Sequence, residues 1–144
     1  MLSYCLWLKL GWKEILFDWK KPTAQMLGRW QPWHSGHTEL FKRIQAEYGQ
    51  VCIMVRDVYG ADAGIGNTDN PFEWSKVIVG IRNALTEHGF TMNQEYIAIR
   101  VPNIVDISYG RGVGYTFTEH DLDKDIQAIS ATNIRAEMRE RGEL

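Results

Sequence analysis

The chain has 144 residues, of which 44% are hydrophobic and 24% are charged. These fractions are near the globular averages of about 45–50% and about 25%, which excludes a disordered or collagen-like chain, and at roughly 150 residues per domain the length suits one domain. Sixteen Lys and Arg against eighteen Asp and Glu leave a net charge of −2. This balance provides no general basic field for nucleic acid or for an anionic membrane.

The cysteine usage and the apolar stretches predict a cytoplasmic protein. Cys5 and Cys52 have neither the spacing of a disulfide framework nor that of a metal knuckle. The apolar stretch 2–10 has no positive region before it and contains Lys9. No run reaches the ~18 apolar residues of a membrane span, so we expect no signal peptide and no transmembrane helix.

Residues 1–22 differ from the remainder of the chain. They are rich in aromatic residues and end in Lys20-Lys21-Pro22, and three of the six tryptophans lie among them. We expect a hairpin or a short packed extension here, followed by one domain over 23–144. The tryptophans could cover this extension or line a ligand site.

From residue 23 the pattern alternates between strand and helix. A short apolar run predicts a strand over 24–27, and the helical spacing of Leu40, Phe41 and Ile44 predicts a helix over 36–48. The continuous β-rich run 50–55 predicts a buried parallel strand. A loop rich in Gly, Asn and Asp follows over 59–69.

The second half continues the alternation. Asn70 as N-cap, Pro71 in the first turn and Glu73 in a capping box predict a helix that ends at 88–89. Strands are expected over 96–101 and 115–118, and a last helix runs from residues 130–132 through Met138. The order predicts an α/β fold, a mostly parallel sheet with helices on both faces.

The strongest chemical pattern lies between the first strand and the first helix. Residues 28–37 read Gly-Arg-Trp-Gln-Pro-Trp-His-Ser-Gly-His, at the carboxyl edge where open α/β sheets bind ligands. His34 and His37 fall on one side of the first helical turn, and Gly36 between them lets a phosphate approach the backbone. With the N–H groups of the helix N-terminus, these residues predict a phosphate cradle.

A second pattern stands at the start of the last helix. In Ile-Ser-Ala-Thr-Asn-Ile-Arg (129–135), Ser130 and Thr132 can cap a helix whose free N–H groups face a phosphate. Arg135 can clamp phosphate oxygens with its fork of donors.

These two patterns resemble hallmarks of the His-x-Gly-His nucleotidyltransferase superfamily. The first is similar to the Gly-Arg-Phe-Gln-Pro-Phe-His-x-Gly-His form of archaeal-type nicotinamide mononucleotide (NMN) adenylyltransferases, and the second matches Ile-Ser-x-Thr-x-Ile-Arg. Asn70-Pro71-Phe72 resembles the Asn-Pro-Phe before their middle helix. The resemblance implies a Rossmann-like fold and adenylyl transfer from ATP to a phosphomonoester, NMN first, with Mg²⁺ and release of pyrophosphate.

The resemblance also implies roles for residues. His34, His37 and Arg135 are the expected catalytic residues, and the expected nucleotide-binding residues are Gly28, Arg29, Gln31, Gly36, Ser130 and Thr132. Apart from the resemblance, the position of Arg56 and Asp57 at the end of the second strand favours a role in binding the acceptor. The glycine-rich segment 109–115 is either a tight turn or an acceptor-binding loop that offers Arg111.

Several alternatives stay open at this point. A cytidylyltransferase acting on a polyol or sugar phosphate is one, and a non-catalytic nucleotide-binding module is another. No protein metal site is expected, because the His34–His37 pair lacks a third ligand. Residues 121–125 begin like a calcium loop, but the glycine required at position 126 and the glutamate required at position 132 are missing. The resembling enzymes are commonly oligomeric, and residues 1–22 could form an interface.

Overall fold

The computed structural model describes residues 16–60 and 69–144. The expected N-terminal hairpin falls largely on residues 1–15, outside the described residues, and residues 16–22 contain turns but no strand. Most of the expected loop 59–69 also lies outside them. The division into an extension and a domain therefore stays a prediction.

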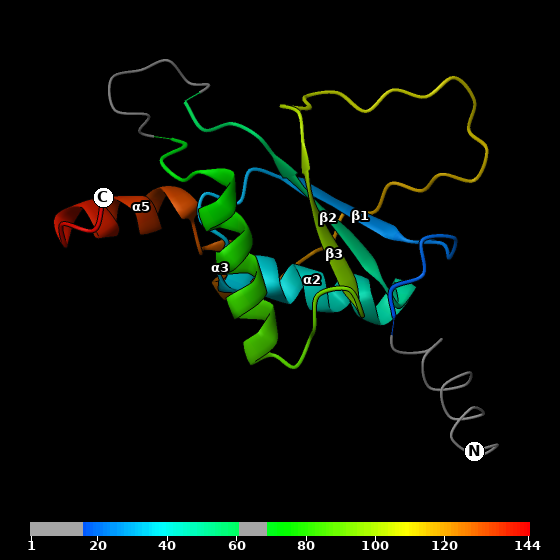
Figure 1. The fold of residues 1–144 in the computed structure, drawn as a ribbon, viewed down its shortest axis with the longest axis horizontal. Helices are drawn as coiled ribbons and strands as arrows, with labels where there is room; N and C mark the ends of the chain where they lie inside the picture. Colours follow the sequence, from blue (N-terminus) through cyan, green and yellow to red (C-terminus); the bar gives the residue numbers. More distant parts are fainter. Residues whose placement is uncertain (1–15, 61–68) are drawn as a thin grey trace, which may run out of the picture.

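Three parallel strands alternate with helices (Figure 1). The elements are β1 (Ala24–Gly28), α2 (Ser35–Tyr48), β2 (Val51–Arg56), α3 (Trp74–Glu87), β3 (Tyr96–Val101), α4 (Lys124–Gln127) and α5 (Ala131–Glu140). The strands stand in the order β1-β2-β3, and Gly28 pairs with Val55, which pairs with Arg100. This confirms the predicted α/β fold with a parallel sheet, consistent with a Rossmann-like fold.

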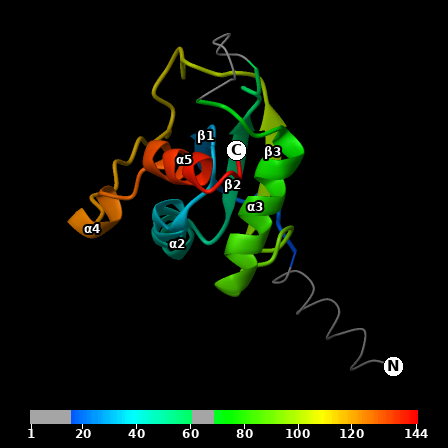
Figure 2. The same ribbon diagram turned by 90° about the vertical axis from the view of Figure 1, so that its left-hand side faces the viewer.

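Both connecting helices lie on the same face of the sheet. α2 and α3 contact each other, and both contact β2; Figure 2 shows them on one side of the strands. The prediction of helices on both faces is therefore not met by the described residues. The reason is topological, because the strand order follows the chain order and two crossovers of the same hand in the same direction place both helices on one face.

The core lies between this face and the two helices. Val51, Ile53 and Val55 of β2 are at most 1% exposed, and they alternate with half-buried residues as the pleat of a strand requires. Ile81 of α3 is fully buried against this layer, as is Phe41 of α2, whose ring meets Tyr96 edge-on. The apolar faces that the periodicity predicted for the strands and helices thus pack into one core.

The start of α3 differs from its prediction. The helix begins at Trp74 rather than at Pro71, and its N-cap is Glu73, without a side-chain capping bond, rather than Asn70. Asn70 is 1% exposed and accepts a hydrogen bond from Arg29. The backbone of Phe72 bonds to the Gln31 side chain, so these contacts with the loop after β1 replace the expected helical cap.

The segment after β3 contains no strand over 102–123. The predicted strand over 115–118 is wrong, because its apolar side chains lie exposed and meet no neighbouring strand to pair with. The short helix α4, which was not predicted, follows. α5 begins as predicted after Ser130, whose Oγ accepts from Asn133 N. None of the helices in the described ranges is long and apolar enough to cross a membrane.

Candidate active site

His34 and His37 cap the N-terminus of α2 with their side chains. Nδ1 of His34 accepts from the backbone N–H of Gly36 at 3.1 Å and of His37 at 3.4 Å, and Nδ1 of His37 accepts from His34 N at 3.1 Å. A neutral imidazole that accepts at Nδ1 carries its proton at Nε2. Each ring therefore has an Nε2–H donor left for a ligand.

The two rings are stacked and share an aromatic surround. Their centroids are 3.5 Å apart at 18°, and His37 also meets the buried rings of Trp30 at 4.8 Å and Trp33 at 5.4 Å. Burial, with the nearby His34 as a second cause, lowers the pKa of His37 to about 3. Burial likewise lowers the pKa of His34. Both rings are therefore neutral hydrogen-bond donors at neutral pH when no anion is bound.

Two glycines leave space for these rings. A Cβ on Gly28 would lie 2.7–2.9 Å from ring atoms of Trp30, and a Cβ on Gly36 would lie 2.9 Å from Cε1 of the His34 ring. Trp30 has a positive φ of 54°, which seats its ring over β1 and lets Nε1 donate to Met54 O at 3.2 Å. Gly28 and Gly36 thus determine where the aromatic and imidazole rings can stand.

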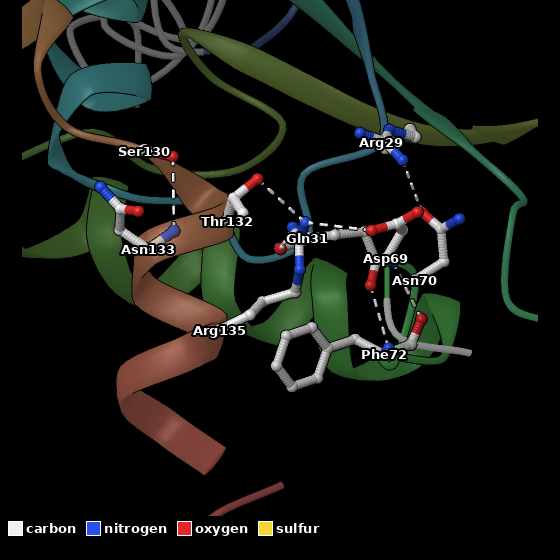
Figure 3. Close-up of polar contacts among 9 residues, drawn as sticks. All are labelled: Arg29, Gln31, Asp69, Asn70, Phe72, Ser130, Thr132, Asn133 and Arg135. Atoms are coloured by element: carbon white, nitrogen blue, oxygen red, sulfur yellow. Dashed lines mark hydrogen bonds and ion pairs between the residues drawn. The ribbon is translucent and has the colours of Figure 1, made fainter. Parts of the chain in front are cut away.

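Arg135 joins the last helix to the first motif (Figure 3). It is 3% exposed, and its Nη1 donates to Gln31 O at 2.6 Å while Nη2 donates to Thr132 Oγ1 at 3.3 Å. Its Nε is buried and finds no partner among the described residues. The nearest carboxylate, that of Asp69, is 3.8 Å away and 60% exposed.

Positive charge therefore exceeds negative charge at this position. Arg29 Nη1 donates to the neutral amide of Asn70 at 3.2 Å. Burial lowers the pKa of Arg135, and the positive charge of Arg29 lowers it further. Two guanidinium groups that raise each other's electrostatic energy are stabilised by an anion that contacts both.

A cavity of about 180 Å³ lies between the two motifs. Its lining comes from both motifs and consists of Gly28, Arg29, Trp30, Gln31, His37, Ala131 and Arg135. Gln31 and Arg135, which bond directly, are 104 positions apart in the chain. The fold thus brings the two sequence patterns together at the carboxyl end of β1.

Three predicted nucleotide ligands have side chains that are already occupied. Oε1 of Gln31 accepts from Phe72 N at 2.9 Å, and its Nε2 donates to Phe72 O at 3.0 Å. Ser130 Oγ accepts from a backbone N–H of α5, and Thr132 Oγ1 accepts from Arg135. Ser130 caps α5 as predicted, whereas the contacts of Gln31 with Phe72 and of Thr132 with Arg135 were not predicted from the sequence.

The acceptor residues predicted from sequence separate into two places. Arg56 ends β2 and Asp57 follows it, at the same sheet edge as the cavity. Arg111 lies in the exposed segment after β3, where it has no polar side-chain contact with either motif. Ala131 and Asp69 were missed, and only the Asn-Pro-Phe resemblance pointed toward the second of them.

The described residues include no group of three or more His, Cys, Asp or Glu that could hold a metal ion. The donors at this cavity are instead N–H groups, suited to phosphate oxygens rather than to a cation.

Comparison with known proteins identifies relatives in archaea. The chain is 33% identical over 67 residues to the nicotinamide-nucleotide adenylyltransferase of Methanococcus aeolicus, covering 46% of this chain and 37% of that protein. It is 30% identical over 86 residues to the enzyme of the same name from Methanococcus maripaludis, covering 60% and 44%.

The chain is a distant homologue of archaeal nicotinamide-nucleotide adenylyltransferases. The resemblance read from the two motifs is confirmed at this level. The matched regions span less than half the length of these adenylyltransferases, and no protein-family model matches the chain.

Proposed function

We propose that the protein is a nucleotidyltransferase that transfers the adenylyl group of ATP to a phosphomonoester, with NMN as the first candidate acceptor, and releases pyrophosphate. The homology to adenylyltransferases supports the reaction class. The observation that carries the proposal is the cavity that His37 and Arg135 line together, from motifs at opposite ends of the domain. Among the described residues, the two guanidinium groups at this cavity have one carboxylate near them, that of the exposed Asp69, 3.8 Å from Arg135.

The geometry suits a triphosphate. The neutral imidazoles of His34 and His37 donate hydrogen bonds from Nε2 to phosphate oxygens, and these bonds stabilise the negative charge that develops there. Arg29 and Arg135 supply fixed positive charge on the other side. A Mg²⁺ ion bound with ATP would offset part of the negative charge that these residues face.

The chemical step needs no covalent nucleophile on the protein. An oxygen of the acceptor phosphate forms a bond to the α-phosphorus as the bond from that phosphorus to the bridging oxygen breaks, and pyrophosphate leaves with the electron pair. Catalysis consists of holding two anions in line and stabilising the charge between them. The stacked neutral histidines serve this purpose because they donate hydrogen bonds to the phosphate oxygens without transferring a proton.

The test measures pyrophosphate release by the purified protein with Mg²⁺, with ATP and CTP in parallel, in the presence and absence of NMN. We expect release that requires both ATP and NMN and that falls ~10²–10³-fold in His37→Asn. The exposed Arg82 of α3, replaced by Met, is the matched control and should keep the full rate.

Other outcomes select the alternatives. Release with CTP and a polyol or sugar phosphate would replace the proposal with a cytidylyltransferase. ATP binding without release, across a broad panel of phosphomonoesters, would replace it with a nucleotide-binding module.

A further inference from the structure

Arg56, the last residue of β2, lacks a counter-ion among the described residues. Its Nη2 donates to the neutral side-chain amide of Asn103 at 2.6 Å. Its Nε is buried and has no hydrogen-bond partner within residues 16–60 and 69–144. The residue is half-buried, and a partly desolvated cation is stabilised when an anion approaches it.

The neighbouring carboxylate is already paired. Both Nε and Nη2 of Arg100 donate to Oδ2 of Asp57, at 3.1 Å and 2.5 Å. The backbone N–H of Asp57 bonds to Val101 O at 2.9 Å, which ties the ends of β2 and β3 together. The carboxylate of Asp57 is thus the partner of Arg100, and no carboxylate among the described residues pairs with Arg56.

Arg56 ends β2 at the sheet edge where β1 leads into the cavity of the candidate active site. Gly28 pairs with Val55 across β1 and β2, so Arg29 and Arg56 are the next residues at the ends of adjacent strands. Adjacent strands are about 4.8 Å apart. Arg56 and the proposed triphosphate site therefore share one edge of the sheet.

We propose that Arg56 binds the phosphate group of the acceptor, a dianionic phosphomonoester; this inference rests on the proposed function. The planar guanidinium can hold two phosphate oxygens at once, which leaves a third oxygen to attack the α-phosphorus. Arg56 also offsets the repulsion between the acceptor dianion and the triphosphate. The Arg100–Asp57 pair holds the strand ends that carry it.

The test uses inorganic phosphate as the probe, because it represents the acceptor group whatever the remainder of the acceptor is. The full-length protein is first saturated with α,β-methylene ATP, whose α–β linkage cannot be cleaved, so that phosphate cannot occupy the triphosphate site. Phosphate binding is then measured by isothermal titration calorimetry. Wild type is compared with Arg56→Met, Arg56→Lys and the matched arginine control Arg82→Met.

We expect Arg56→Met to weaken phosphate binding by about tenfold or more, the loss of one charged hydrogen-bonding group. The phosphate affinity of Arg56→Lys should lie between those of wild type and Arg56→Met, because lysine keeps the positive charge but lacks the paired N–H donors of a guanidinium. The phosphate affinity of Arg82→Met should match that of wild type. Unchanged affinity for α,β-methylene ATP in every variant shows that the fold and the nucleotide site are intact.

The outcomes separate this inference from the proposed function. Wild-type phosphate affinity in Arg56→Met, or no phosphate binding by the wild-type nucleotide complex, overturns the acceptor site and leaves nucleotide binding standing. Failure to bind α,β-methylene ATP, with phosphate binding to the free protein that still depends on Arg56, overturns the proposed function and leaves the anion site.

Discussion

Gln31 and Phe72 form a reciprocal pair, in which the side-chain amide of Gln31 accepts from Phe72 N at 2.9 Å and donates to Phe72 O at 3.0 Å. Both residues are at most 5% exposed. The pair connects the loop after β1 to the approach of α3. It also leaves the carbonyl of Gln31 for Arg135, so one residue couples three parts of the site.

Replacing Gln31 by Leu should destabilise the fold by about 2–4 kcal/mol, because it leaves two buried backbone groups of Phe72 without partners. Urea unfolding followed by circular dichroism measures this. Gln25 on β1 is exposed, and Gln25→Leu should stay within about 0.5 kcal/mol of wild type. Equal stabilities for the two variants would contradict the structural role of the pair.

His37 can be replaced so that its two ring nitrogens are tested separately. Asn retains an acceptor near the position of Nδ1 for His34 N, whereas Gln places a donor near the position of Nε2. We expect His37→Asn to keep the fold and lose ~10²–10³ in turnover, and His37→Gln to retain more activity. Pyrophosphate release, measured beside thermal unfolding, checks the ranking, and a more active Asn variant would reverse the assignment of the donor.

Acid should destabilise the protein through His37. Its pKa is about 3 in the folded protein against an ordinary 6.5. Below about 6.5 the unfolded chain therefore binds a proton that the folded one excludes, and stability falls as the pH falls toward 3. Urea unfolding between about pH 7.5 and about pH 5 should show a shallower decline in His37→Asn. Parallel curves for the two proteins would mean that His37 titrates normally when folded.

Two glycine-to-alanine changes should have opposite effects. Gly80 lies exposed in α3 with no atom within 4 Å of an added Cβ, so Gly80→Ala should stabilise the fold by about 0.5–1 kcal/mol. Gly36→Ala would bring a Cβ to 2.9 Å from the His34 ring, and it should displace that imidazole and reduce turnover. Unfolding curves and pyrophosphate release for both variants provide the measurement. Full activity in Gly36→Ala would show that the ring can move without consequence.

The local elements were predictable where side-chain period and helix capping agree with the tertiary contacts. The runs over 24–27, 50–55 and 96–101 are strands within one or two residues, and Ser130 caps the last helix. The start of α3 was misplaced because Asn70-Pro71-Phe72 has good capping chemistry but bonds to distant residues instead. The apolar alternation over 115–118 predicted a strand that has no neighbour to pair with.

By itself the sequence determined the α/β alternation and the two motifs, because these depend on periodicity and on residues close together in the chain. The reaction class is what the resemblance of these motifs to a known family implies. Only the tertiary structure decided that both crossover helices share one face and that Arg135 reaches Gln31. It also decided that the Gln31 side chain bonds to Phe72, and that Asp57 pairs with Arg100 rather than with Arg56. Each of these depends on contacts between segments that are distant in the chain. A local sequence pattern does not specify which of these segments meet or which donor bonds to which acceptor.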